Sequence, residues 1–181
     1  MNKTLLIIGS EGGLGKEIVS LCKDQGYSVV GLDLNESAQS ACDHYLPLNL
    51  LDFNNQMLTD WLSQNQFSFD QIIFTSGIGY YGDFEKQTNI HQTLKINFTA
   101  QALLAKVIQK FVKPNGQLIF IGSVASHMPT PSYEVYSASK AALESFVRSW
   151  RQEVKDQFQV RLFLPGGMKT DFHEKVGFVP D

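Results

Sequence analysis

Short apolar runs alternate with longer segments of helical period along this chain. Each run is brief, rich in β-branched residues and closed by glycine or a polar residue, which is typical of strands. The clear runs are TLLIIG (4–9), YSVVGLD (27–33), DQIIFTSG (70–77), GQLIFIGS (116–123) and QVRLFLPG (159–166), with a weaker one, HYLPLN, at 44–49. Their nearly unbroken apolarity indicates strands that are buried on both faces, as in a parallel sheet.

The segments between these runs have the periodicity of amphipathic helices. In the first of them Leu14, Ile18 and Leu21 recur at helical spacing, and Gly26 marks its end. We expect further helices over residues 54–66, 89–111 and 133–157. This alternation predicts a doubly wound α/β fold, a mainly parallel sheet with helices on both faces, whose ligands bind beyond the carboxyl ends of the strands. The length of 181 residues fits one domain over residues 1–181.

Composition and charge exclude several classes of function. The net charge is -3, and Lys and Arg are scattered, which argues against nucleic acid or an anionic membrane surface as a partner. No segment approaches the roughly 20 apolar residues of a membrane helix. Cys22 and Cys42 lack metal-ligand spacing and suit reduced thiols. We therefore expect a soluble cytoplasmic protein with no metal site and no nucleic-acid or membrane partner.

A glycine-rich turn lies between the first strand and the first helix. Gly9, Gly13 and Gly15 would let backbone amides approach a pyrophosphate at the positive end of the helix. Asp33 follows eighteen residues after Gly15, where a carboxylate can bind both ribose hydroxyls of an adenosine. Its charge, with that of Glu11, would repel a 2'-phosphate, which favours NAD over NADP. Alternatively, Asp33 is a plain strand-end or helix-capping residue.

Tyr136 and Lys140 lie one turn apart on the same face of the last predicted helix. An ammonium beside a phenol favours the phenolate and lowers a pKa that is ordinarily about 10. Such a pair could give a proton to a carbonyl oxygen or take one from an alcohol. The spacing alone is more commonly a solvated pair on a helix surface. Two companions strengthen the catalytic interpretation: Ser123 at the end of a strand, and Asn97 within the preceding helix, whose alternative is an ordinary polar face.

The glycine turn and these polar side chains together carry a family resemblance. Over residues 4–170 the sequence resembles the short-chain dehydrogenase/reductase family, which implies a Rossmann fold with strand order 3-2-1-4-5-6. The family's catalytic tetrad corresponds to Asn97, Ser123, Tyr136 and Lys140. The positions that would bind an NAD cofactor, with NADH preferred over NADPH, are Gly9, Gly13, Leu14, Gly15, Asp33, Asn49, Leu50, Gly77, Tyr136, Lys140, Pro165, Gly166, Met168 and Thr170.

The resemblance also implies a mechanism, which is hydride transfer between the nicotinamide and a substrate carbon. Tyr136 would exchange the proton as general acid or base, and Ser123 would hold the substrate oxygen. Lys140 would bind the nicotinamide ribose and lower the pKa of the phenol. Asn97 would position a water in a proton relay. The cofactor performs the redox step, while the protein orients and polarises the reactants.

The sequence departs from the family pattern in three places. FTSG (74–77) replaces the usual Asn-Asn-Ala-Gly, so the amides that brace the central strands are missing and the two hydroxyls could replace them only in part. Ile8 removes a hydroxyl that commonly precedes the first glycine. The chain ends at Asp181, eleven residues after Thr170, so we expect a short or absent substrate lid and no seventh strand.

The two long predicted helices, 89–111 and 133–157, are the candidate surface for a homodimer. They carry Leu103, Val107, Phe146 and Trp150, which could equally form intrachain core.

The leading hypothesis is an NAD(H)-dependent oxidoreductase acting on a small or medium-sized alcohol or carbonyl compound. Loops near the expected cleft carry apolar and aromatic residues that could line its pocket, namely Tyr80, Tyr81, Phe84, Met128 and Tyr133. The alternative is an NAD(H)-binding sensor or assembly module with little turnover, which a missing lid would favour and the complete tetrad opposes. An epimerase or dehydratase that uses the same cofactor also stays open.

Overall fold

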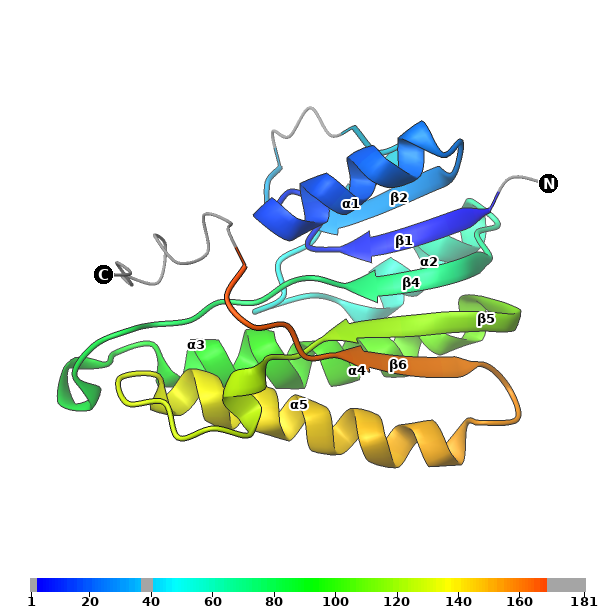
Figure 1. The fold of residues 1–181 in the computed structure, drawn as a ribbon. Coiled ribbons are helices and arrows are strands. Elements are labelled where there is room, and N and C mark those ends of the chain that lie inside the picture. The colour runs from blue at the N-terminus through cyan, green and yellow to red at the C-terminus, as the bar shows by residue number, and fades with distance from the viewer. Residues whose placement is uncertain (1–2, 37–40, 169–181) are drawn as a thin grey trace.

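A parallel sheet forms the centre of the protein in the computed structural model, which describes residues 3–36 and 41–168. Six strands in this part pair side by side in the order β3-β2-β1-β4-β5-β6, which confirms the predicted doubly wound order. All neighbouring strands pair in parallel, and the arrowheads labelled in Figure 1 point to the same side of the molecule. The strands are β1 (Thr4–Ile8), β2 (Ser28–Asp33), β3 (His44–Pro47), β4 (Phe69–Phe74), β5 (Val112–Ile121) and β6 (Gln159–Phe163).

Helices join the strands close to the predicted positions. Asn54 caps α2, because its side-chain oxygen accepts hydrogen bonds from Gln56 N at 2.8 Å and Met57 N at 3.0 Å. The predicted helix 133–157 ends earlier, at Glu153, and helix 89–111 is built from four joined segments. The α-helices are α1 (Gly13–Asp24), α2 (Asn55–Gln64), α3 (Ile90–Leu94), α4 (Ala100–Ile108) and α5 (Glu134–Glu153). The other helical segments are the 3-10 turns η1 (Phe84–Lys86), η3 (Gln109–Phe111) and η4 (Val124–Ser126), and the π-helical segment η2 (Lys95–Thr99).

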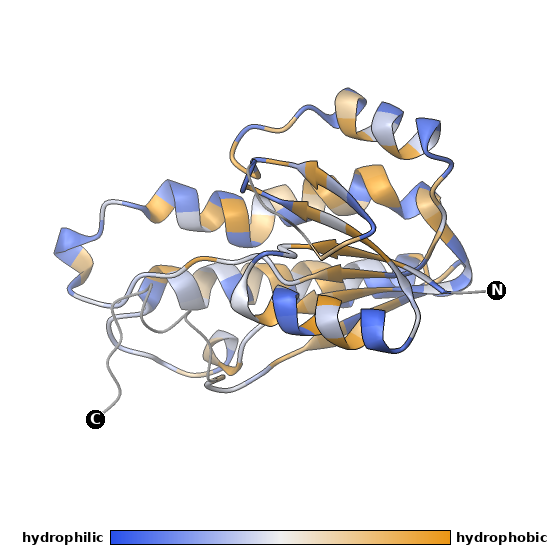
Figure 2. Cartoon of the chain, turned by 90° about the horizontal axis from the view of Figure 1, so that it is seen from above, coloured by the Kyte–Doolittle hydropathy of each residue, from blue (hydrophilic) through white to orange (hydrophobic). Residues whose placement is uncertain are grey.

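The hydrophobic core lies on both faces of the sheet, because strand side chains alternate between the faces. Leu6 and Ile8 of β1 belong to a large cluster that includes residues of α2, α4 and α5, whereas Leu5 and Ile7 belong to a smaller cluster with α1. Figure 2 shows the apolar strands enclosed between helices. Among residues 3–36 and 41–168, none of the helices has the length and hydropathy that a membrane-spanning helix needs.

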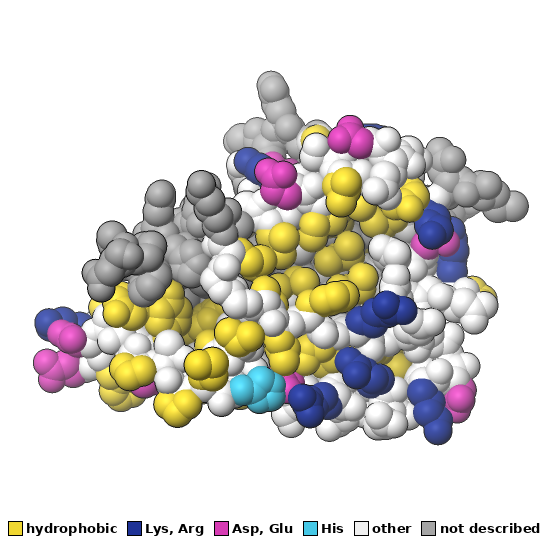
Figure 3. Space-filling view, in the orientation of Figure 1, with side chains coloured by type: hydrophobic (Ala, Val, Ile, Leu, Met, Phe, Trp, Pro, Cys, Tyr) yellow, Lys and Arg dark blue, Asp and Glu magenta, His cyan; other side chains and the backbone are white. Residues whose placement is uncertain are grey.

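The face of the sheet on which α1 lies is covered unevenly. Ile119 packs only at the margin of the smaller cluster, and Phe163 on β6 is 52% exposed. Figure 3 shows hydrophobic side chains gathered over this side of the sheet, below α1. The helices of the opposite face cover their side more completely, as the larger cluster there shows.

The carboxyl ends of β1 and β4 are joined at the edge where the site forms. The Thr75 hydroxyl oxygen lies 2.9 Å from the Ile8 carbonyl oxygen and 3.0 Å from that of Gly9, so its proton bridges the two strand ends. Thr75 therefore supplies a brace at the position where the sequence departs from the family pattern. The Ser76 hydroxyl has no hydrogen-bond partner within the described residues.

Candidate active site

The turn after β1 requires glycine at two positions. Gly9 has a φ of +91°, and a Cβ there would lie 2.7 Å from Ser76 N. A Cβ on Gly15 would lie 1.9 Å from the Gly9 carbonyl oxygen, so α1 can approach the turn only without a side chain. Gly12, the N-cap of α1, has no side chain to bond the first-turn amides. Those amides therefore lack a side-chain cap, and amides at the start of a helix can bind an anion.

Asp33 ties the end of β2 to the glycine turn. Its Oδ2 accepts a hydrogen bond from Glu11 N at 2.8 Å, and its Oδ1 accepts one from Leu34 N at 2.7 Å. Each carboxylate oxygen retains a further lone pair, so the structural role and the predicted ribose contact are compatible. Burial together with the negative charges of Asp33 and Glu11 raises the pKa of Tyr45 to about 12. This corner of the site is therefore electronegative.

A cavity of about 640 Å³ runs along the carboxyl ends of β1, β4, β5 and β6. It brings together predicted residues that lie far apart in the sequence. Those that line it are Gly13, Leu14, Gly15, Gly77, Ser123, Tyr136, Lys140, Pro165, Gly166 and Met168. Gly9, Asp33, Asn49, Leu50 and Asn97 are not among the lining residues. Thr170, and the segment on which a short lid was expected, lie outside the described residues.

Two of the positions outside the cavity have local roles instead. Asn49 is exposed, and its side-chain oxygen accepts a hydrogen bond from Leu51 N at 2.9 Å in the turn after β3. Leu50 packs against the larger hydrophobic cluster. Neither contact tests the predicted place of these residues beside an adenine, which stays a prediction.

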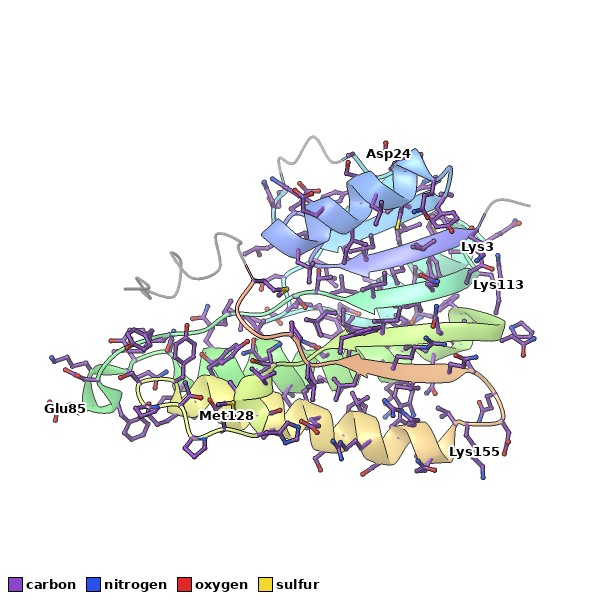
Figure 4. The ribbon with its side chains drawn as sticks, viewed as in Figure 1. Lys3, Asp24, Glu85, Lys113, Met128 and Lys155 are labelled. Atoms are coloured by element: carbon purple, nitrogen blue, oxygen red, sulfur yellow. The ribbon has the colours of Figure 1, made fainter. Side chains whose placement is uncertain are left out.

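The cavity also has a wall that sequence reasoning described only in part. Tyr81, Met128 and Tyr133, which were candidates for an apolar pocket, do line it, and Met128 is labelled on its loop in Figure 4. The lining residues missed by sequence reasoning are Gly12, Thr75, Ile121, Gly122, Val124, Ala125, Thr130, Pro131 and Gly167. Most of these follow the end of a predicted strand or flank a predicted site residue, and that position is the signal that could have found them.

Ser123, Tyr136 and Lys140 lie together in the wall of this cavity. Ser123 forms a hydrogen bond with the Tyr136 side chain. Lys140 is only 4% exposed, and its Nζ donates a hydrogen bond to the Ile121 carbonyl oxygen at 2.9 Å. The same nitrogen lies 5.8 Å from the centroid of the Tyr136 ring. Thus the end of β5 and one face of α5 present a hydroxyl, a phenol and an ammonium to the same space.

The expected lowering of the phenol's pKa is wrong for this structure. Burial raises the pKa of Tyr136, although its hydrogen bond with Ser123 opposes that rise. Burial also lowers the pKa of Lys140 to about 8. Sequence spacing predicts only that the two side chains share a helix face, whereas the desolvation that dominates both groups comes from the packed fold.

Asn97 lies behind the cavity and braces its wall. Its Oδ1 accepts a hydrogen bond from Ile78 N at 2.8 Å, and its Nδ2 donates to the Ile78 carbonyl oxygen at 2.7 Å and to Ser139 Oγ at 2.9 Å. It is completely buried at the centre of η2, whose π-helical turn accommodates an inward amide. Asn97 thus links the segment after β4 to α5, and its predicted water-positioning role stays a prediction.

The described residues contain no group of three or more His, Cys, Asp or Glu side chains that could hold a metal ion.

Comparison with known proteins identifies the family. The sequence matches the short chain dehydrogenase family model over residues 3–177. It is 27% identical to an uncharacterized oxidoreductase of Schizosaccharomyces pombe, over 93% of this chain and 62% of that protein. It is 30% identical to a 3-oxoacyl-(acyl-carrier-protein) reductase of Buchnera aphidicola, over 93% of this chain and 75% of that protein.

The fold is similar to solved structures of the same kind. A short chain dehydrogenase from Shigella flexneri, complexed with NADP, matches with a TM-score of 0.87 at 21% identity, over 97% of this chain and 82% of that one. At this identity the likeness shows the fold alone. The sequence match over nearly the whole chain, joined to the sheet order, shows that this chain belongs to the short-chain dehydrogenase family of oxidoreductases.

Proposed function

We propose that this protein is an NAD(H)-dependent oxidoreductase that interconverts an alcohol and a carbonyl group. One observation carries the proposal. Tyr136, hydrogen-bonded to Ser123 and close to the buried Lys140, lines the same cavity as the glycine turn. A proton-transfer group and an anion-binding turn in one cavity suit a reaction in which a dinucleotide and a small substrate meet.

The residues present fit a nicotinamide dinucleotide. The turn at Gly9 and Gly15 is so closely packed that added side chains would clash, and it leaves the first amides of α1 for a pyrophosphate. Lys140 donates to one carbonyl oxygen, and its ammonium has further protons with which it could bind a ribose. Pro165 and Met168 line the cavity beyond β6, where they would contact the nicotinamide. When bound, the cofactor supplies or accepts the hydride.

The chain's own chemistry concerns the proton. Tyr136 keeps its proton near neutral pH, because burial raises its pKa, so the phenol suits the role of donor to a carbonyl oxygen. Ser123 would orient that oxygen with its hydroxyl. In alcohol oxidation the same phenol must first lose its proton, which predicts that oxidation is favoured by alkaline conditions.

The preference for NADH is part of the proposal. Its support is the electronegative corner made by Asp33 and Glu11, whose charges act on Tyr45 and would repel a 2'-phosphate. The Shigella flexneri structure was solved with NADP, and that ligand is a property of the Shigella protein. The ratio of kcat/KM for NADH to that for NADPH tests this preference.

The proposed substrate is a small or medium-sized carbonyl compound or alcohol. Tyr81, Met128 and Tyr133 form an apolar part of the cavity wall, with the Tyr81 and Tyr133 ring centroids 5.2 Å apart. The Buchnera aphidicola relative is a reductase of a 3-oxoacyl group, which is a carbonyl substrate of this class. We also propose a homodimer through α3–α4 and α5, and a cytoplasmic location, which the buried thiol of Cys22 supports.

The experiment mixes the protein with NADH and a panel of ketones, aldehydes and quinones, and follows the loss of nicotinamide absorbance. Wild type should turn over at least one compound, and Tyr136→Phe should lose turnover while it still binds NADH. The alternative function, a sensor or assembly module, predicts tight NADH binding and no turnover on any compound. Activity that survives in Tyr136→Phe would remove the phenol from the mechanism.

A further inference from the structure

A buried carboxylate on α5 contacts the segment that follows Ser123. Glu144 is 5% exposed, although it carries a charge. Its Oε2 accepts a hydrogen bond from Ser126 Oγ at 2.6 Å and lies 3.0 Å from His127 Nε2. Its Oε1 lies 2.7 Å from the Arg148 guanidinium, one helical turn further on. A carboxylate with so little exposed surface requires such partners. Ser126, the last residue of η4, and His127, which follows it, provide two of them.

Ser126 in turn closes the turn that begins at Ser123. Its hydroxyl oxygen lies 2.7 Å from the Ser123 carbonyl oxygen, and its backbone N–H donates to that same oxygen at 3.1 Å. Within this turn Ala125 N donates to Ser123 Oγ at 3.2 Å. The Ser123 hydroxyl accepts in that contact, so its proton remains available for its hydrogen bond with the Tyr136 side chain.

The geometry points to Glu144 as a positioning residue: by holding Ser126 it fixes the turn that aims the Ser123 hydroxyl at Tyr136. This inference rests on the proposed function, in which those two side chains meet the substrate oxygen. Tyr136, Lys140 and Glu144 follow one another at intervals of four residues on a single face of α5. Lys140 bonds the end of β5 at Ile121, and Glu144 bonds the turn beyond it.

The pKa of Tyr136 reports this arrangement directly. The hydrogen bond from Ser123 lowers that pKa against the effect of burial, so a displaced Ser123 should let it rise. Tyr133 and Lys140, whose side chains lie close to the Tyr136 ring, are unchanged in every variant below. A carboxylate disfavours a phenolate, so loss of the Glu144 charge by itself could only lower the pKa of Tyr136. The direction of the change is therefore diagnostic.

The test titrates tyrosinate absorbance in each variant against the same variant carrying Tyr136→Phe. Glu144→Ala and Ser126→Ala should both raise the pKa of Tyr136. Glu144→Gln retains an acceptor for Ser126 and should leave the pKa of Tyr136 near its wild-type value. The control is Glu153→Gln, an exposed carboxylate on the same helix. Ser126→Ala removes the same link from the loop side, so the test does not depend on whether Glu144→Ala folds.

Kinetics supply the second measurement. With the carbonyl compound that wild type reduces, Ser126→Ala and Glu144→Ala should lower kcat by roughly 10- to 100-fold and leave the KM for NADH unchanged, since neither residue touches the glycine turn. If the pKa of Tyr136 in both alanine variants equals the wild-type value, the inference is overturned. If wild type reduces no compound, the proposed function fails, whereas the titration still decides the role of Glu144.

Discussion

Lys140 places a positive charge almost entirely inside the protein. Burial holds its pKa at about 8, below the ordinary 10.5, and among residues 3–36 and 41–168 its ammonium donates one hydrogen bond, to the Ile121 carbonyl oxygen. A shift of this size corresponds to a cost on the order of 3 kcal/mol when both folded and unfolded states carry the charge. Retention of such a cation is understandable if it binds and polarises a ligand.

We expect Lys140→Met to stabilise the protein at pH 7 by roughly 1 to 3 kcal/mol, because an apolar side chain of similar length removes the cost of burying the charge. Between about pH 8 and 10.5 the unfolded state binds more protons than the folded state, so the free energy of unfolding of wild type should rise with pH. The stability advantage of Lys140→Met over wild type should therefore shrink. Urea unfolding of both proteins at pH 7 and pH 10 measures this. Lys16→Met, at an exposed site on α1, is the control, and a gap of equal size at both pH values would contradict the prediction.

Asp33 is the residue on which cofactor choice should depend. Asp33→Asn removes the charge but keeps one acceptor for the backbone N–H groups that the carboxylate now binds. The preference for NADH over NADPH should fall by about tenfold, which corresponds to ~1.4 kcal/mol of lost repulsion. Ratios of kcat/KM for the two cofactors measure it. Asp24→Asn, at the far end of α1 in Figure 4, should leave the ratio unchanged, and an unchanged ratio in Asp33→Asn would refute the role.

The two helices of the predicted dimer surface show why burial is hard to infer from a single sequence. Trp150 is 9% exposed and Val107 and Phe146 pack against the core, so these residues are largely intrachain. Leu103 remains exposed at 36%, beside a groove of about 440 Å³ that Phe98, Phe146 and Trp150 also line. The helical periodicity predicted which face of each helix is apolar, but it did not predict how much of that face the sheet covers.

At this element, Leu103→Glu should convert a dimer to a monomer, because a charge would be buried against apolar side chains. Sedimentation of wild type and variant at the same protein concentration tests the prediction. Leu21→Glu places the same charge on α1, where Leu21 is 58% exposed, and should not alter sedimentation. A wild type that sediments as a monomer, or a variant that stays dimeric, would rule out this surface.

Other elements show which features of the fold local sequence signals can predict and which they cannot. The glycine turn, most of the strands and α1 were predicted well, because glycine positions and apolar runs act within a few residues. The strand predicted over 116–123 is an exception, since β5 begins at Val112. The π-helical turn at η2 was not visible, since it depends on Asn97 reaching Ile78 and Ser139 across the fold. The helical periodicity of the sequence likewise did not predict that α5 ends at Glu153.

On the scale of the whole molecule, the cavity spans the ends of four strands and should couple ligand binding to global stability. NADH at a hundredfold excess over its Kd should stabilise the fold by ~2.7 kcal/mol and raise Tm by roughly 5 to 10 °C. Adenosine monophosphate, which could reach only the Asp33 corner and the glycine turn, should give a smaller shift at equal concentration. Thermal unfolding measures both shifts. Equal shifts for the two ligands would mean that the nicotinamide end makes no contact with Lys140 or the 165–168 loop.

The sequence by itself determined the order of elements, the glycine turn and the spacing of Tyr136 and Lys140, because these follow from local geometry and from periodicity. Tertiary structure alone decided that desolvation raises the pKa of the phenol and lowers that of the ammonium. It also brought the Thr75 hydroxyl to the end of β1 and Ser126 to the buried carboxylate of Glu144. Burial and contacts between distant segments exist only after the chain has packed, which is why no reading of neighbours along the sequence could supply them.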